Sequence, residues 1–428
     1  MLVIKNAHLV NPATAFEGDV NIYIEGDVIA RIEPVSNGLN GISDDAELID
    51  ASGLSAIPGL IDVHTHFRDP GFTYKEDIES GAKAAAAGGY TTVIMMCNTK
   101  PAIDNTDTLK ECLAKGETCD IRVLSCAAVT KGLKGEEMTD IPALLQAGAV
   151  GLTDDGIPIM NENIVREVFR KAAEYNVPVS LHEEDPALIT NNGVNRGAAS
   201  DFYQIGGSPR EAEITMIERD LAIALETGAI VNIQHISTKE GVELVRKAKA
   251  VPGNNVHAEA TPHHIALTEE AVIEKGTLAK VNPPIRTEED RQAILAGLQD
   301  GTIDIIATDH APHAPEEKAK DITQAPSGML GLETAFALAN RVLVKECGMP
   351  FSEMVDKFTV APAKMYHLPY GDVSVGKIAD IVLVDPNEKW IVEGFHSKSQ
   401  NSPFIGEEMT GRIHYTLCEG KIAYSLVK

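Results

Sequence analysis

The sequence has few cysteines and lacks any apolar run long enough to cross a membrane. Its six cysteines are scattered and form no C-x-x-C pair, which argues against a zinc ribbon and for reduced thiols. No stretch approaches the roughly 20 apolar residues that a membrane-spanning helix needs. The N-terminus lacks the basic region and long apolar core of a signal peptide. We therefore expect a cytoplasmic protein that does not enter a membrane.

Basic residues are also scarce. The chain has 37 Lys and Arg against 63 Asp and Glu, a formal net charge of −26. Such a surface repels polyanions, so neither nucleic acid nor an anionic membrane is expected as a partner. The 428 residues are enough for one large catalytic domain and a smaller one.

Eight short apolar runs alternate with helical patterns in the middle of the chain. We expect these runs to be strands, at residues 60–66, 90–96, 121–126, 149–153, 177–182, 230–235, 254–259 and 303–308. Residues 161–176 and 209–228 have the apolar spacing of helices, and the second stretch places Pro209 in its first turn. Eight strand–helix units over about 250 residues predict an α/β fold, a (β/α)₈ barrel. A doubly wound open sheet is the competing topology, but no G-x-G-x-x-G follows the first strand to support it.

The two ends of the chain differ from the middle. Residues 1–55 and 371–428 both contain strand-like runs bounded by Gly, Asn and Asp. Neither end holds enough strand to bury a sheet comfortably by itself. We therefore predict one small composite β-domain from 1–55 and 371–428, beside a barrel domain at 56–370.

Histidines and aspartates lie at the same end of five expected strands. His64 and His66 close the first strand, where residues i and i+2 project from the same face. The others follow later strands: Asp154, Asp155, His182, His235 and Asp309. Barrel enzymes build their active sites at the C-terminal ends of the strands, so these side chains should converge. A single one is readily explained as a structural histidine or a helix cap, but four histidines and two carboxylates at five strand ends are not.

Imidazole and carboxylate are the ligands that zinc and similar ions accept. Six such groups are more than one tetrahedral ion needs, and they predict a two-metal site with a bridging hydroxide. No Ser or Cys has the G-x-S-x-G context of a covalent nucleophile. The sequence thus favours hydrolysis by a metal-bound hydroxide over covalent catalysis.

Four more polar residues lie on the loops after these strands: Arg68, Asn98, Asn282 and His313. An arginine presents a planar fork that suits a carboxylate, and an asparagine offers both a donor and an acceptor. The structural alternative for Arg68 is a salt bridge to Asp69 or to an acidic helix end. For the two asparagines it is a role in turns, since prolines are close by.

Eight longer motifs, taken in order, are specific enough to indicate a family. They are "GLIDVHTHFRDPG", "TDDG", "SLHEED", "QHISTKEGVELVR", "EATPHHIALTEE", "KVNPPIRTEEDR", "ATDHAPHAPEEK" and "NSPFIG". Over nearly its whole length the chain resembles the dihydroorotases of the bacterial class I type, in the amidohydrolase superfamily. The resemblance implies a zinc-containing (β/α)₈ barrel with a composite β-domain. It also implies the reversible interconversion of (S)-dihydroorotate and water with N-carbamoyl-L-aspartate, in de novo pyrimidine (UMP) biosynthesis.

The resemblance also implies roles for individual residues. It implies two zinc ions per subunit, with His64 and His66 on one ion, His182 and His235 on the other, Asp155 bridging both, and Asp309 as a ligand and the catalytic acid/base. The implied substrate contacts are His66, Arg68, Asn98, Asn282, His313, Ser327 and Gly328. Arg68 and Asn98 would hold the substrate carboxylate. Ser327 stands where relatives often carry Phe.

Two alternatives remain. Hydantoinases, dihydropyrimidinases and allantoinases resemble the chain in the first histidine pair, but they bridge their metals with a carbamylated lysine. The fourth strand end, "AVGLTDDG", offers only aspartates. A catalytically inactive barrel kept as a scaffold should have lost ligands, whereas this chain keeps all six. We expect a small-molecule substrate. The sequence does not decide whether the chain forms a homodimer or binds a transcarbamoylase.

Overall fold

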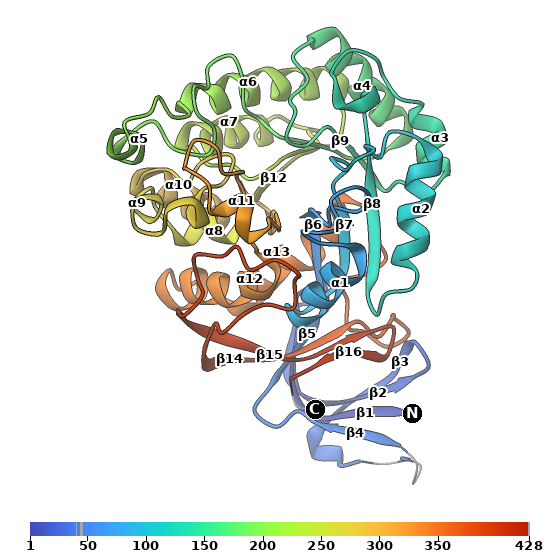
Figure 1. Ribbon diagram of the computed structural model, residues 1–428. Helices are drawn as coiled ribbons and strands as arrows, with labels where there is room; N and C mark the ends of the chain where they lie inside the picture. Colours follow the sequence, from blue (N-terminus) through green and yellow to red (C-terminus); the bar gives the residue numbers. More distant parts are fainter. Residues whose placement is uncertain (40, 43–45, 427–428) are drawn as a thin grey trace.

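Eight parallel strands form the centre of the larger part of the molecule (Figure 1). The computed structural model describes residues 1–39, 41–42 and 46–426. The barrel strands are β6 (Leu60–Thr65), β7 (Tyr90–Met95), β8 (Arg122–Ala128), β9 (Gly151–Thr153), β10 (Val179–Leu181), β11 (Val231–Ile233), β12 (Val256–Ala260) and β13 (Ile305–Ile306). They neighbour one another in chain order, and each lies on an expected run. The predicted barrel is confirmed, and the doubly wound alternative is wrong.

The barrel closes between its last and first strands through a side chain as well as the backbone. A bridge joins Thr65 to His310. Beneath it, the fully buried carboxylate of Asp62 accepts hydrogen bonds from the backbone N–H of Thr308 and of His64, each at 3.1 Å. The hydroxyl of Thr308 donates to the other oxygen of Asp62. One carboxylate therefore ties the seam of the barrel to the backbone of a predicted metal ligand.

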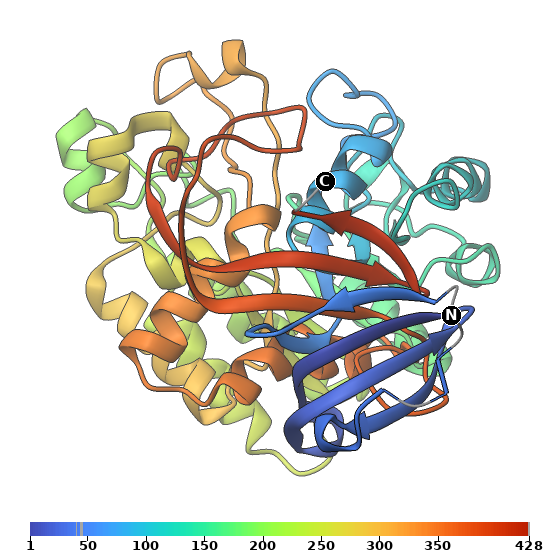
Figure 2. The same cartoon turned by 90° about the horizontal axis from the view of Figure 1, so that it is seen from below.

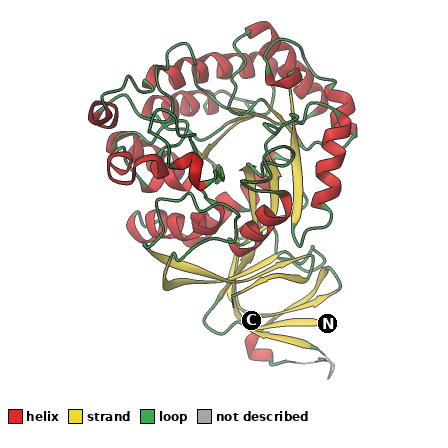
Figure 3. Ribbon diagram, viewed as in Figure 1, coloured by secondary structure: helices red, strands yellow, loops and turns green. Residues whose placement is uncertain are grey.

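Helices cover the outside of the barrel (Figure 3). The longer ones are α1 (Ile78–Ala87), α2 (Thr106–Gly116), α4 (Glu162–Tyr175), α6 (Arg210–Thr227), α7 (Lys239–Lys249), α10 (Glu288–Asp300), α12 (Leu332–Ala339) and α13 (Phe351–Phe358). The shorter ones are α3 (Ile141–Gln146), α5 (Ala198–Tyr203), α8 (Pro262–Ala266), α9 (Glu270–Lys275), α11 (Pro315–Lys318) and α14 (Val360–Met365). In the described part of the chain, none of these helices has the length and hydropathy that crossing a bilayer requires.

The two helices expected at 161–176 and 209–228 are present as α4 and α6. Helix α4 buries Val165, Val168, Phe169 and Ala172, the three- and four-residue spacing on which its prediction rests. In α6 the placement of Pro209 in the first turn is wrong. Pro209 is the N-cap residue, with φ −74° and ψ 155°, and the helix begins at Arg210. The ψ of Pro209 is extended, as is usual for an N-cap residue, so Pro209 precedes the helix and does not belong to its first turn.

Strands from both chain ends form one mixed sheet beside the barrel (Figure 2). They are β1 (Leu2–Asn11), β2 (Phe16–Glu25), β3 (Val28–Pro34), β4 (Glu47–Asp50), β5 (Ser55–Pro58), β14 (Ile381–Ile391), β15 (Glu408–Cys418) and β16 (Lys421–Ser425). Strand β5 joins the two halves, because it pairs parallel with β1 and antiparallel with β14. Ile4, Ile22, Ile381 and Leu417, from both ends, share one buried cluster. The composite sheet is confirmed, while the domain boundaries remain a prediction.

We predict that Asp62→Ala destabilises the fold, because it leaves the N–H groups of Thr308 and His64 buried without an acceptor. The expected loss is about 2–4 kcal/mol of unfolding free energy, measured by urea denaturation. Asp120→Ala, at an exposed position, is the matched control and should change stability little. If the two variants were equally stable, the claim that Asp62 stabilises the junction of the last and first barrel strands would be wrong.

Candidate active site

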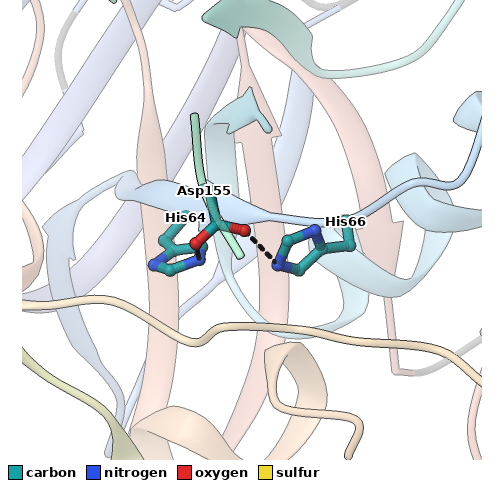
Figure 4. Close-up of side chains that lie close together, drawn as sticks. All are labelled: His64, His66 and Asp155. Carbon is teal, nitrogen blue, oxygen red and sulfur yellow. Dashed lines mark ion pairs between the residues drawn. The ribbon is translucent and has the colours of Figure 1, made fainter. Parts of the chain in front are cut away.

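The first histidine pair and Asp155 meet at the end of β6. His64 and His66 are buried and lie on either side of the Asp155 carboxylate (Figure 4). Asp155 Oδ1 is 3.5 Å from Nε2 of His64, and Oδ2 is 3.4 Å from Nε2 of His66. The alternation of a strand thus presents two imidazoles to one carboxylate, an arrangement that can hold a metal ion.

The second histidine pair lies close to the same carboxylate. His182 follows β10 and His235 follows β11, and Nδ1 of His182 is 3.0 Å from Nε2 of His235. Asp155 Oδ1 is 3.9 Å from Nδ1 of His182. Among the described residues there are two potential metal-binding groups, and Asp155 is the member they share. The carboxylate of Asp155 is therefore within reach of both histidine pairs.

The side chains present fit a divalent cation. Nε2 of His64 is buried and has no hydrogen-bond partner among the described residues. Burial lowers the pKa of His64, but the carboxylates of Glu259 and Asp155 outweigh this and raise it well above its usual value, so these carboxylates require positive charge nearby. Burial and the neighbouring His182 hold the pKa of His235 well below its usual value, which favours the neutral imidazole that binds metal.

Asp309 lies on the same side of the site as the first histidine pair. Its Oδ1 is 3.0 Å from Nε2 of His66 and 3.5 Å from Nε2 of His64. Burial raises the pKa of Asp309, but the hydrogen bond from His66 and the charge of His64 hold it well below its usual range. Its backbone φ is +47°, a conformation that a non-glycine residue adopts at a cost and that is typical of functional sites.

Glu259, which the sequence analysis missed, is bonded to His64 of the first histidine pair. This fully buried residue of β12 accepts a hydrogen bond from Nδ1 of His64 at 2.5 Å and one from Nδ2 of Asn232 at 2.8 Å. Carboxylates in this position fix the tautomer of a ligating histidine and leave Nε2 for the metal. The available signal was a glutamate within an expected barrel strand, because charged residues are rarely fully buried unless they are paired.

Glu184, also missed, lies next to the second pair. Its Oε2 is 3.3 Å from Nε2 of His182, and its Oε1 accepts a hydrogen bond from Oγ of Ser208 at 2.9 Å. Burial lowers the pKa of His182, but the Glu184 carboxylate outweighs it and raises the pKa overall. Each histidine pair therefore has one buried glutamate that orients an imidazole.

Arg68 is partly buried at the mouth and has no ion-pair partner among the described residues. Its Nε donates to the carbonyl oxygen of Pro312 at 3.3 Å. The alternative that Arg68 forms a salt bridge to Asp69 is wrong, because Asp69 pairs with Lys115 at 2.8 Å. Burial lowers the pKa of Arg68. A desolvated guanidinium of this kind is suited to bind an anion.

Asn98 and Asn282 contact different members of the metal-binding groups. Asn98 Oδ1 is 2.9 Å from Nδ1 of His66, and its Nδ2 donates to Oδ2 of Asp155 at 3.1 Å. Asn282 Nδ2 is 3.3 Å from Nε2 of His182. Its Oδ1 is buried without a hydrogen-bond partner in the described residues. Both asparagines therefore contact ligand histidines, which a role in turns alone does not explain.

His313, Ser327 and Gly328 come together from two loops. Nε2 of His313 is 2.8 Å from the carbonyl oxygen of Ser327. Oγ of Ser327 is buried and unpaired within the described residues. Gly328 has φ +135°, and a Cβ there would lie 2.7 Å from that of Ala311. The close approach of the loops thus requires glycine at this position.

Comparisons with known proteins agree with this geometry. The model of the amidohydrolase family matches residues 55–423. The dihydroorotases of Clostridium acetobutylicum and Clostridioides difficile are each 49% identical to this chain over 426 residues, which is 99% of this chain and 99% and 100% of theirs. The L-hydantoinase (dihydropyrimidinase) structure from Arthrobacter aurescens has a TM-score of 0.87 at 25% identity, over 100% of this chain and 97% of its own.

The chain therefore belongs to the amidohydrolase family, the class that the barrel and its His/Asp groups define. Within this family it belongs with the dihydroorotases, which it matches over the full length.

The two adjacent aspartates should respond differently to substitution. Asp154 forms no ion pair with these histidines among the described residues, and it accepts hydrogen bonds from the N–H groups of Val129 at 2.8 Å and Thr130 at 3.2 Å. We predict that Asp155→Ala loses bound metal. Asp154→Ala should keep metal and lose about 1–3 kcal/mol of stability, because it leaves buried donors unpaired. Metal analysis of the purified variants checks this, and equal metal loss in both would contradict it.

Proposed function

We propose that this dihydroorotase holds two zinc ions per subunit and interconverts (S)-dihydroorotate plus water with N-carbamoyl-L-aspartate in UMP biosynthesis. The observation that carries the proposal is the Asp155 carboxylate between two histidine pairs. All six predicted ligands lie together at the barrel mouth, which supports an active enzyme over an inactive scaffold. The six free cysteines fit the cytoplasmic location that we expect.

The end of β9 favours this reaction over that of the hydantoinases. Asp154 and Asp155 follow the strand there, and no lysine is available to form a carbamate bridge. The structural likeness to the hydantoinase is a likeness of fold, at 25% identity.

The donor set suits zinc, which accepts imidazole nitrogen and carboxylate oxygen. When bound, such ions lower the pKa of water and polarise a carbonyl group for attack. His64, His66, His182 and His235 would supply the nitrogen ligands, and Asp155 would supply carboxylate oxygen shared by both groups. Glu259 keeps Nδ1 of His64 occupied, so that Nε2 is directed to the site.

Asp309 is the group placed to move the proton. Its Oδ1 faces Nε2 of His66 and of His64, so we assign proton transfer to Oδ2. As an ionised carboxylate, Asp309 can accept a proton from the attacking water. It then gives the proton to the ring nitrogen as the amide bond breaks. In ring closure the same carboxylate takes the proton from the carbamoyl nitrogen.

The partly buried polar groups at the mouth suit a small ring that carries a carboxylate. Nε of Arg68 bonds to the carbonyl of Pro312, so the other N–H groups of its guanidinium can bind the carboxylate as a fork. Asn98 would contribute the second contact to that carboxylate. Oδ1 of Asn282 and Oγ of Ser327 would bond to the ring amide groups, which gives partners to two buried atoms.

Removal of metal is the first test of the proposal. Chelation should abolish turnover of dihydroorotate, and added zinc should restore it, because the sequence has no G-x-S-x-G motif for a covalent nucleophile. The assay includes dihydrouracil, hydantoin and allantoin, for which we expect little turnover. Full activity in metal-free protein would contradict the two-metal proposal, and preferred turnover of hydantoin or dihydrouracil would contradict the substrate.

Arg68 should determine specificity for the carboxylate. Dihydrouracil is nearly the same ring without that group, and binding it would leave the Arg68 charge unpaired. We expect discrimination of about 10³ or more. Arg68→Met should lower kcat/KM for dihydroorotate steeply without loss of metal, and Arg68→Lys should not fully rescue it, because lysine lacks the fork.

The matched control is Arg170→Met, at an exposed arginine of α4, which should keep wild-type kcat/KM. If Arg68→Met behaved like this control, the carboxylate would be held elsewhere.

A further inference from the structure

The motif "NSPFIG" lies outside the barrel, on the loop that joins β14 to β15. This loop, residues 392–407, leaves the small sheet in the direction of the barrel and is red in Figure 1. Asn401, its first motif residue, is buried. None of the roles assigned to the metal-binding and substrate-binding residues explains why a loop of the small sheet reaches this far.

Asn401 uses its side-chain amide to hold two loops of the barrel mouth together. Oδ1 accepts a hydrogen bond from the backbone N–H of His313 at 2.9 Å. Nδ2 donates to the carbonyl oxygens of Ala311 at 3.0 Å and Gly328 at 3.1 Å. The backbone carbonyl of Asn401 accepts from the N–H of Leu330 at 3.0 Å. Asn401, from the loop between β14 and β15, thus bonds both to the segment 311–313 and to the segment 328–330.

The groups that Asn401 holds are those that carry the proposed substrate contacts. Between Ala311 and His313 lies Pro312, whose carbonyl oxygen accepts from Nε of Arg68. His313 itself is a predicted contact, and its Nε2 bonds to the residue before Gly328. A shift of the short segment 311–313 would therefore move the positions of Arg68 and His313 together.

The loop 392–407 is also bonded to the loop that joins β6 to α1. Ser397 donates to the fully buried carboxylate of Glu76, and the N–H of Lys398 donates to the other oxygen of that carboxylate at 3.2 Å. Oγ of Ser399 donates to the carbonyl oxygen of Lys75 at 2.7 Å. Because these contacts anchor the loop independently of Asn401, a change at Asn401 should leave its course intact.

Gly328 has a support that does not depend on Asn401. The buried Lys318 donates to the carbonyl oxygens of Pro326 at 3.0 Å and Gly328 at 2.9 Å. Loss of the Asn401 amide would leave Gly328 held by Lys318. The N–H of Ala311 likewise keeps its bond to the carbonyl oxygen of Met329 at 2.9 Å, so the movement should centre on Pro312, the partner of Arg68, and on His313.

We propose that Asn401 is a positioning residue of this enzyme: the small sheet reaches into the active site, and its Asn401 amide sets the positions of Arg68 and His313. This inference rests on the proposed function, because those two side chains are its substrate contacts. Positioning errors of the order of 1 Å cost an enzyme about 100-fold in rate, so a single amide is sufficient to matter.

The test compares Asn401→Asp and Asn401→Ala with the control Gln400→Ala. Aspartate has the shape of asparagine and keeps an acceptor for the N–H of His313, but it has no donor for the two carbonyl groups. Gln400 is exposed, and within the described residues its side chain bonds only to Phe395 and Ser397 of its own loop. The measurements are kcat and KM for dihydroorotate, metal content, and amide hydrogen exchange of peptides covering residues 309–331.

We expect Asn401→Asp to raise KM about tenfold or more, and to lower kcat/KM about 10- to 100-fold, at unchanged metal content. Exchange should be faster around residues 311–313, and Gln400→Ala should match the wild type. In the double variant with Arg68→Met, the loss in kcat/KM should be smaller than the product of the two single losses, because both act on one contact.

Wild-type KM and wild-type exchange in Asn401→Asp would overturn the proposal, as would loss of metal or of folded protein in that variant. If Asn401→Ala does not fold, the isosteric Asn401→Asp still decides. If the wild type does not turn over dihydroorotate, the proposed function fails. The exchange measurement still tests whether Asn401 positions residues 311–313.

Discussion

The site depends on one buried carboxylate that has to serve two pairs of histidines. Burial alone would raise the pKa of Asp155, yet the histidines around it hold that pKa well below its usual value. A charge this deeply buried is tolerated only when opposite charge surrounds it. The barrel supplies that surrounding because four of its strands end with their side chains directed at one point. The alternation within β6 adds the second imidazole without any further element.

The bonds that close the barrel and the bonds that shape the site are partly the same. Asp62 joins β13 to β6 and also holds the backbone N–H of His64. Glu259 accepts from Nδ1 of His64 and from the N–H of His235 at 3.3 Å, so one side chain reaches both histidine pairs. Buried carboxylates therefore hold two of the predicted ligands, His64 and His235, from inside the fold.

Local pattern in the sequence was sufficient for the strands and for the side chains at their ends. The spacing of His64 and His66 makes them neighbours on any strand, and the repeated strand–helix alternation implied that the strand ends would converge. Pattern was not sufficient for groups whose partners are distant in the chain. Glu259 meets His64 across 195 residues. Asn401 meets Ala311 across 90. Such contacts follow from tertiary packing, which periodicity does not encode.

The central claim, that Asp155 joins two metal ions, is tested most directly by anomalous X-ray diffraction at the zinc absorption edge, on crystals grown with zinc. We predict two anomalous peaks, one on each side of the Asp155 carboxylate. One should lie about 2.0–2.1 Å from nitrogens of His64 and His66, and the other at the same distance from His182 and His235. A single peak, or two peaks bridged by a residue other than Asp155, would contradict the account.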